Sequence, residues 1–206
     1  LYRKEIELVD HQKGWKTDTD EAQKRMIIGD FKLENNEVVR VVNGYFPQGE
    51  NREHPIKFPA KVKFYDDLMN YLENECSNQQ NLAVIGDFNI SPTDLDIGIG
   101  EPNRKRWLRD GKTSFLPEER AMWQRLINWG LHDTFRTIHP DEDNIFSWFD
   151  YRSRGFDREP RRGLRIDTVL ATPTLNAKAI ASEVGYEVRG MDKPSDHAPV
   201  WTEFKF

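Results

Sequence analysis

Leu82-Ala83-Val84-Ile85-Gly86-Asp87-Phe88-Asn89-Ile90-Ser91-Pro92-Thr93-Asp94 is the stretch that decides the fold. Its four leading apolar residues, bounded by Asn81 and Gly86, predict a short buried strand. An acid, Asp87, and an amide, Asn89, follow the glycine directly. In open sheets covered by helices, ligands bind at the carboxyl ends of strands, so this pair is a candidate site. Taken alone, the pair fits an ordinary turn with solvated side chains at least as well.

The composition predicts a soluble globular protein. Charged residues make up 32% of the 206 residues and hydrophobic ones 37%, and we expect one domain over residues 1–206. No run is long enough to cross a membrane, and the single cysteine, Cys76, fits a reducing compartment, so we expect a cytoplasmic protein. The net charge of −5 argues against indiscriminate nucleic-acid binding but leaves room for a local basic face.

Strand and helix patterns alternate along the chain. Four runs predict strands: residues 26–33, 38–46, 165–171 and 196–204. Two runs with helical spacing predict helices: residues 59–75 and 117–129. Residues 91–112 are polar and typical of a loop. Strands that alternate with helices indicate a layered α/β or α+β fold.

Asp167 is an acid inside a predicted strand. Period-two alternation gives it the same face as Val169 and Ala171, where an unpaired buried carboxylate would be costly. A purely structural partner would be Arg165 or a backbone cap. A chemically active partner would be His197, at the start of the last predicted strand.

Three acids and one histidine at strand ends suit hydrolysis assisted by a hard divalent cation. Oxygen ligands favour Mg²⁺ or Mn²⁺, and a phosphate would supply the remaining oxygens. Zinc is not expected, because the cysteine is alone and no histidines pair at ligand spacing. Ser195-Asp196-His197 holds the residue types of a nucleophilic triad, but neighbours on a strand point to opposite faces and cannot line up.

Two basic clusters interrupt the otherwise acidic chain. The first surrounds Trp107 and comprises Arg104, Lys105, Arg106, Arg109 and Lys112. The second comprises Arg152, Arg154, Arg158, Arg161, Arg162 and Arg165. A charge run is usually solvated surface. Here the aromatic residues between the clusters also fit phosphate contacts with a ring for an unstacked nucleotide.

Several of these stretches resemble the exonuclease III family, the DNA-repair members of the endonuclease/exonuclease/phosphatase superfamily. The motifs are Gly-Tyr-Phe-Pro-Gln-Gly-Glu at residues 44–50, Gly-Asp-Phe-Asn-Ile-Ser-Pro-Thr-Asp at 86–94, Arg-Ile-Asp at 165–167 and Ser-Asp-His-Ala-Pro at 195–199. Residues 51–60, 94–109 and 146–152 are similar to the bacterial members. The shorter motifs imply phosphoester chemistry, and the longer stretches imply the DNA enzyme.

The resemblance implies a four-layered α/β sandwich, with two packed mixed β-sheets flanked by helices, here missing the first strands and helix. It implies a DNA-repair phosphodiesterase that depends on Mg²⁺ or Mn²⁺. The implied activities are 3′-to-5′ exonuclease on double-stranded DNA, abasic-site endonuclease and 3′-phosphatase. The implied partners are double-stranded DNA and abasic-site DNA, with no membrane, and the intact protein is expected to be monomeric.

Motif positions imply a role for each site residue. Asp87 would orient or deprotonate the attacking water, with Asn89 fixing it, while His197 would contact the scissile phosphate, held by Asp167. Whether Asp87 or His197 is the base stays open. Tyr45 would hydrogen-bond the phosphate or leaving group. The implied metal-site residues are Asp196, Asp87 and Asn89. The implied DNA contacts are Arg25, Gln48, Trp148 and Leu164, of which the last two would wall a pocket for a flipped abasic sugar.

One departure from the family concerns the metal. The family begins with a strand that carries a metal-site asparagine, followed by a Leu-Gln-Glu-Thr motif whose glutamate is a principal metal ligand, and neither is in this sequence. We therefore expect an N-terminally incomplete domain that binds metal weakly or not at all. Two other functions stay open: a superfamily phosphoesterase acting on a lipid or inositol phosphate, and a catalytically dead DNA-binding fragment.

Overall fold

The computed structural model describes residues 1–19 and 22–206. Within them, the strands are β1 (Glu7–Lys13), β2 (Met26–Lys32), β3 (Val38–Tyr45), β4 (Asn81–Asp87), β5 (His132–Asp133), β6 (Asp167–Ala171), β7 (Ala179–Val184) and β8 (Val200–Phe204). The helices are α1 (Lys57–Glu75), η1 (Asp94–Asp96), α2 (Glu101–Arg109), α3 (Pro117–Trp129), α4 (Thr134–Ile138), η2 (Gly155–Asp157), α5 (Pro173–Asn176) and α6 (Tyr186–Arg189).

The strands form two sheets. The larger has the order β1-β2-β3-β4-β6-β5, and the smaller consists of β7 and β8. Strand β4 runs parallel to β3 and antiparallel to β6, so the larger sheet is mixed. The predicted strands at 26–33 and 38–46 are β2 and β3, paired as the expected hairpin. The buried strand predicted before Gly86 is β4.

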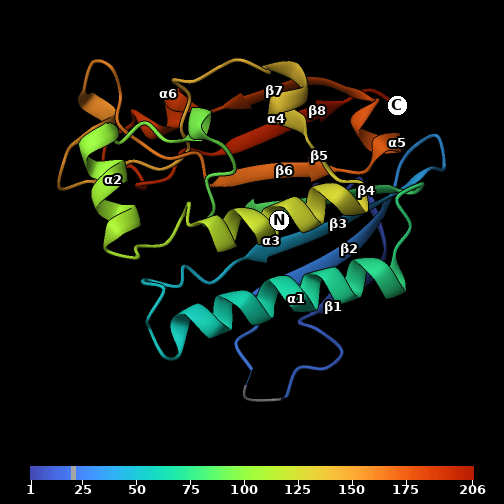
Figure 1. Ribbon diagram of the computed structural model, residues 1–206. Helices are drawn as coiled ribbons and strands as arrows, with labels where there is room; N and C mark the ends of the chain where they lie inside the picture. Colours follow the sequence, from blue (N-terminus) through green and yellow to red (C-terminus); the bar gives the residue numbers. More distant parts are fainter. Residues whose placement is uncertain (20–21) are drawn as a thin grey trace.

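Helices α1 and α3 lie across one face of the larger sheet (Figure 1). Their apolar sides supply Phe64, Leu68, Met122 and Trp123 to the main core, which also contains Val84 of β4. Both helices fall where helical spacing predicted them, and α3 ends at Gly130 as expected. This packing fixes the position of β4, and therefore the position of Asp87 at its carboxyl end.

The smaller sheet packs beside β6. Thr134 at the start of α4 joins the two sheets, because its hydroxyl donates to the Val169 carbonyl at 2.9 Å and lies 2.7 Å from the Thr202 hydroxyl. Two sheets with helices on their faces are the predicted α/β sandwich architecture. Ile27 of β2 lies on the face of the larger sheet opposite to α1, and it is 45% exposed.

Three sequence expectations need correction. Residues 91–112 are not simply a loop, since they contain η1 and α2. Helix α2 buries little, with Trp107 and Leu108 only partly covered against Phe115, so its apolar periodicity was too weak to predict it. The predicted strands at 165–171 and 196–204 begin later, at Asp167 and Val200, and Pro199 has no N–H for a ladder. The short or edge strands β1, β5 and β7 were not predicted.

Hydropathy along the helices also bears on membranes. Within residues 1–19 and 22–206, the structure contains no helix with both the length and the apolar character needed to span a bilayer.

Candidate active site

Strand register places three site residues in one row. Tyr45 pairs with Asp87 across the parallel strands β3 and β4, and Asp87 pairs with Asp167 across the antiparallel strands β4 and β6. The Tyr45 N–H donates to the Arg25 carbonyl at 2.8 Å, which extends the row to the edge of β2. Tyr45 and Asp87 lie at the carboxyl ends of β3 and β4, where the carboxyl-end rule predicted Asp87, and Asp167 lies beside them as the first residue of the antiparallel strand β6.

Gly86 makes the close approach of β3 and β4 possible. Its φ of +133° is a conformation that side-chain-bearing residues rarely adopt. A Cβ atom at Gly86 would lie 1.9 Å from the carbonyl oxygen of Gly44 on the neighbouring strand. Any larger residue would push the strands apart beside Asp87, so the glycine is a requirement of the site's geometry.

Asp87 is held by the amide that follows it. The Asn89 backbone N–H donates to Asp87 Oδ1, and Asn89 Nδ2 donates to Asp87 Oδ2, both at 2.9 Å. Asn89 Nδ2 also donates to the Phe46 carbonyl at 3.0 Å, which fixes the amide in turn. Burial, followed by the negative charge of Asp167, raises the pKa of Asp87 to about 7. Such a carboxyl group can take up or release a proton near neutral pH.

His197 and Asp167 form the predicted pair. His197 Nδ1 lies 2.8 Å from Asp167 Oδ2. Burial works to lower the pKa of His197, but the hydrogen bond and charge of Asp167, with the charges of Asp87 and Asp196, outweigh it, and the pKa is raised. Asp167 is itself oriented by Ser147, whose hydroxyl accepts the Asp167 N–H at 2.9 Å.

The cluster fits a hard cation. Ligand atoms of Asp87, Asp167 and His197 lie within 4.8 Å of one another, the one such group in the described part of the chain. Two part-buried carboxylates that repel each other are stabilised by a divalent ion, and oxygen ligands are those that Mg²⁺ and Mn²⁺ prefer. Asp196 is not in this group, because its Oδ2 accepts a hydrogen bond from Trp148 Nε1 at 3.0 Å. Its contact with a metal stays a prediction.

The residues predicted to touch DNA surround this cluster. Trp148 forms isolated β-bridges with both Leu164 and His197, so this half-buried residue lies beside the Asp167–His197 pair. Leu164 is only 1% exposed and packs beneath Trp148, which makes it a support for the indole in this structure. Gln48 is exposed, and its side-chain oxygen accepts the Glu50 N–H at 3.0 Å.

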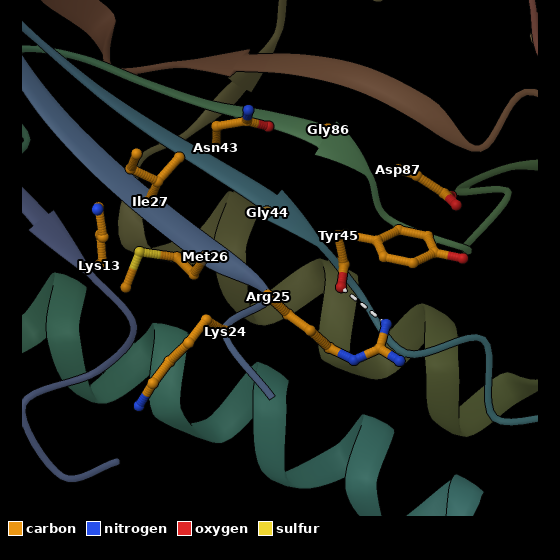
Figure 2. Close-up of a pocket in the computed structure, with 10 residues that line it drawn as sticks. All are labelled: Lys13, Lys24, Arg25, Met26, Ile27, Asn43, Gly44, Tyr45, Gly86 and Asp87. Atoms are coloured by element: carbon orange, nitrogen blue, oxygen red, sulfur yellow. Dashed lines mark hydrogen bonds between the residues drawn. The ribbon is translucent and has the colours of Figure 1, made fainter. Parts of the chain in front are cut away.

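A cavity of about 430 Å³ opens beside Asp87 and Tyr45. Figure 2 shows the Tyr45 ring and the Asp87 carboxylate extending past the strand ends, with Arg25 below them. The Arg25 guanidinium lies 4.9 Å from the centre of the Tyr45 ring and donates to the Tyr45 carbonyl at 3.4 Å. Lys13 and Lys24 also line the cavity, so its rim is cationic.

The sequence interpretation missed several supporting residues and misplaced one. Lys13 and Lys24 belong to the cavity, yet isolated lysines carry no sequence signal. Lys61 is fully buried and donates to the Asn89 carbonyl at 2.8 Å, and a lysine on the apolar side of a predicted helix was the available clue. Arg165 is not the partner of Asp167, because it is buried and pairs with Asp96 and Asp133. For the same reason, Arg165 is not part of the predicted basic face.

Comparison with known proteins identifies the family of the chain. The model of the endonuclease/exonuclease/phosphatase family matches residues 1–197. The chain belongs to this family. Exodeoxyribonuclease III of Haemophilus influenzae is 55% identical over 194 residues, which are 94% of this chain and 72% of that protein. An exodeoxyribonuclease of Bacillus subtilis is 26% identical over 80% of this chain, which spans only 59% of that relative.

Solved structures of family members share the fold. A 3′ phosphatase from Neisseria, bound to a product DNA hairpin, superimposes with a TM-score of 0.84 at 33% identity, over 98% of this chain and 72% of that one. An AP endonuclease from Archaeoglobus fulgidus superimposes with a TM-score of 0.83 at 27% identity, again over 98% and 72%. Within the family, the chain therefore groups with nucleases of the exonuclease III type.

Proposed function

We propose that the protein is a DNA-repair phosphodiesterase that hydrolyses double-stranded DNA with the help of Mg²⁺ or Mn²⁺. Its activities would be 3′-to-5′ exonuclease, incision at abasic sites and removal of 3′-phosphates. The observation that carries the proposal is the row of Tyr45, Asp87 and Asp167 with His197 bound to Asp167. The names of the relatives from Haemophilus and Neisseria support DNA as the substrate.

His197 would bind and polarise the scissile phosphate. Its Nδ1 is engaged by Asp167, so Nε2 is the nitrogen left to face a substrate. The raised pKa keeps the ring cationic to higher pH, which favours contact with a phosphate oxygen. Asp167 acts through the histidine by fixing its orientation.

Asp87 would receive the proton of the attacking water. A carboxylate fixed beside the reacting phosphate is suited to act as a general base. The two hydrogen bonds from Asn89 hold its oxygens toward the strand end. Tyr45 is 60% exposed, so its hydroxyl is free to donate to the phosphate or to the leaving oxygen.

Asp87 and Asp167 would hold the cation, with Asp196 and Asn89 as further candidates, and without the family's glutamate we expect them to hold it weakly. When bound, the cation would supply charge neutralisation on the phosphate oxygens. Lys24 and Arg25 would position the DNA backbone on the cationic rim of the cavity. We further propose a monomer that works beside the chromosome in the cytoplasm.

Substrate competition tests the proposal. The wild-type chain is incubated with Mg²⁺ and a labelled duplex that carries an abasic site or a 3′-phosphate, with unlabelled duplex or a soluble inositol phosphate as competitor. We expect incision and 3′-phosphate release that duplex DNA suppresses and inositol phosphate does not. The opposite order would indicate a small-molecule phosphoesterase. Binding of duplex that weakens with salt but yields no product would indicate a DNA-binding module.

A further inference from the structure

Arg189, the last residue of α6, is a buried cation that forms no ion pair with the described residues. It is 7% exposed, and its guanidinium carbon lies 4.7 Å from the centre of the Phe156 ring and 5.6 Å from those of Phe149 and Tyr151. Its Nε is buried without a hydrogen-bond partner in the described part of the chain. Rings alone compensate a buried guanidinium only in part, so a missing anion is expected.

Two acids in the segment that carries the Phe149 and Phe156 rings, Asp150 and Asp157, contact other groups. Asp157 pairs with Arg154, with Arg154 Nε at 3.4 Å from its carboxylate. Asp150 accepts the backbone N–H groups of Arg152 and Ser153, both at 3.2 Å. Within residues 1–19 and 22–206, no carboxylate forms an ion pair with Arg189. Asp157 lines the cavity with Arg154 and Arg189, so the lining keeps one positive charge in excess, which points to an external anion.

Arg189 lines a cavity of about 290 Å³ that has room for such an anion. Arg154 and the 61% exposed Met191 line the same cavity. Arg161 lies 5.0 Å from the centre of the same Phe156 ring, outside the cavity lining, and its Nε has no hydrogen-bond partner among the described residues. Planar guanidinium groups match the oxygens of a phosphate.

The cavity adjoins the active site through shared residues. The ring of Phe149 lies under Arg189, and the Phe149 N–H donates to the Asp196 carbonyl at 2.9 Å. Tyr151, which lines the cavity, donates its hydroxyl to the Pro194 carbonyl, two residues before Asp196. These contacts join the cavity wall to the segment that carries Asp196 and His197.

We propose that the Arg189 cavity binds a DNA backbone phosphate other than the scissile one, an assignment that rests on the proposed nuclease function. The contact is independent of base sequence, because it uses charge and the phosphate oxygens alone. It lengthens the bound tract of DNA without touching the reacting atoms. Its loss therefore weakens DNA binding and leaves the chemical step unchanged.

Salt-dependent binding tests the site. Affinity for a labelled duplex is measured by fluorescence anisotropy in EDTA, at salt concentrations between about 50 and 200 mM, for the wild type and Arg189→Gln. Each phosphate contact contributes about 0.9 to the slope of log affinity against log salt for duplex DNA. We expect Arg189→Gln to lose about that much slope and about tenfold in affinity, with kcat on abasic duplex unchanged.

A second variant tests the same cavity independently, in case Arg189→Gln misfolds. Met191→Glu places a carboxylate at the exposed lining of the cavity, and its matched control, Met191→Gln, has the same size without the charge. We expect Met191→Glu to weaken binding as Arg189→Gln does, and Met191→Gln to bind like the wild type. Arg125→Gln, which removes an exposed arginine on α3, controls for net charge and should keep the wild-type slope.

Two results would overturn the assignment. If Met191→Glu binds like Met191→Gln and Arg189→Gln keeps the wild-type slope while DNA is still cleaved, the cavity holds no DNA phosphate and the nuclease function stands. If the wild type neither binds nor cleaves DNA, the site and the proposed function fail together.

Discussion

Asp167 is the residue that connects His197 with Asp87 in the candidate site. It accepts the hydrogen bond of His197 on one side and faces Asp87 across the strand pair on the other. Its hydrogen bond and charge raise the pKa of His197 against the effect of burial. Burial is the larger cause of the raised pKa of Asp87, and the charge of Asp167 adds to it.

Asp167→Asn tests this coupling directly. Removal of the charge and its hydrogen bond leaves burial as the main influence on His197, so we expect its pKa to fall. Proton NMR titration of the histidine C2–H signals in metal-free protein measures the change, with the exposed Asp192→Asn as control. We expect the control to leave His197 unchanged. An unaltered His197 pKa in Asp167→Asn would contradict the pairing.

Lys61 supports the site from below. Its buried ammonium pairs with Glu119 and donates to the carbonyls of Asn89 and Gln48, at 2.8 and 3.3 Å. Burial lowers the pKa of Lys61, while Glu119 opposes that shift. The pair ties helix α1 to the loop that orients Asp87.

Lys61→Met should unfold more easily, because it leaves Glu119 as an uncompensated buried charge. We expect a loss of about 3–5 kcal/mol in the free energy of unfolding, measured in urea. Lys63→Met, which removes an exposed i,i+4 pair with Asp67, should cost less than about 0.5 kcal/mol. Equal losses in the two variants would contradict the role given to Lys61.

At the scale of elements, the approach of β3 and β4 is set by Gly86. Gly86→Ala adds a methyl group where the Gly44 carbonyl oxygen already lies, so we expect lost activity and a destabilisation of about 2–4 kcal/mol. Gly100→Ala is the matched control: its φ is +84°, but the nearest heavy atom to a Cβ there lies 4.0 Å away. We expect that variant to lose about 1 kcal/mol and keep its activity. Similar losses at both positions would count against the strand-approach argument.

Asp96 links η1 to the start of β6 and to α4. Its Oδ1 accepts Arg165 Nε at 2.7 Å and Arg136 Nη2 at 2.5 Å. Burial works to raise the pKa of Asp96, but the charges and hydrogen bonds of both arginines outweigh it and hold the pKa below its usual value of 3.8. Because the folded-state pKa is the lower one, the stabilisation is complete above the unfolded-state pKa and is lost as the pH falls through the folded-state pKa.

Acid unfolding should reveal this link. We expect the wild type to lose stability as the pH falls below about 4, and Asp96→Asn to be less stable at neutral pH and to lose less on acidification. Thermal unfolding followed by circular dichroism at pH 3 to 7 (roughly the range of carboxylate titration) measures both. If Asp96→Asn keeps the full acid sensitivity of the wild type, the link contributes nothing.

Apolar periodicity in the sequence predicted the helices and strands that bury a continuous apolar face. It did not predict the elements that depend on contacts in the folded structure. The buried strand before Gly86 and the helices α1 and α3 have unmistakable apolar spacing. Helix α2 buries only part of Trp107 and Leu108, and the edge strands β1 and β7 carry mixed polar patterns, so the sequence does not distinguish them from loops. The pairing of Asp167 with His197 was predicted because an acid within a strand needs a partner, whereas Lys61 needed the packed structure.

For the whole molecule, the sandwich brings residues from opposite ends of the chain to one edge. Arg25 and Tyr45 come from the first half, and Asp167 and His197 from the second, so the site exists only when both sheets are assembled. Motifs named Tyr45, Asp87, Asp167 and His197, which the structure brings together, but could not predict that Asp196 accepts a hydrogen bond from Trp148 or that Leu164 is buried. We propose that residues 1–206 fold as one unit, with activity and structure lost together in urea.

The assignment of the strand-end cluster as the active site is tested most directly by an incision assay. The assay measures the rate at which the wild-type chain incises a duplex at a single abasic site, with saturating Mg²⁺ and with EDTA. If the strand-end cluster performs the chemistry, incision requires Mg²⁺, and Asp87→Asn and His197→Asn each slow it by about 10²-fold or more while duplex binding is retained. Incision at the wild-type rate by both variants, or in EDTA, would contradict the assignment of this cluster as the active site.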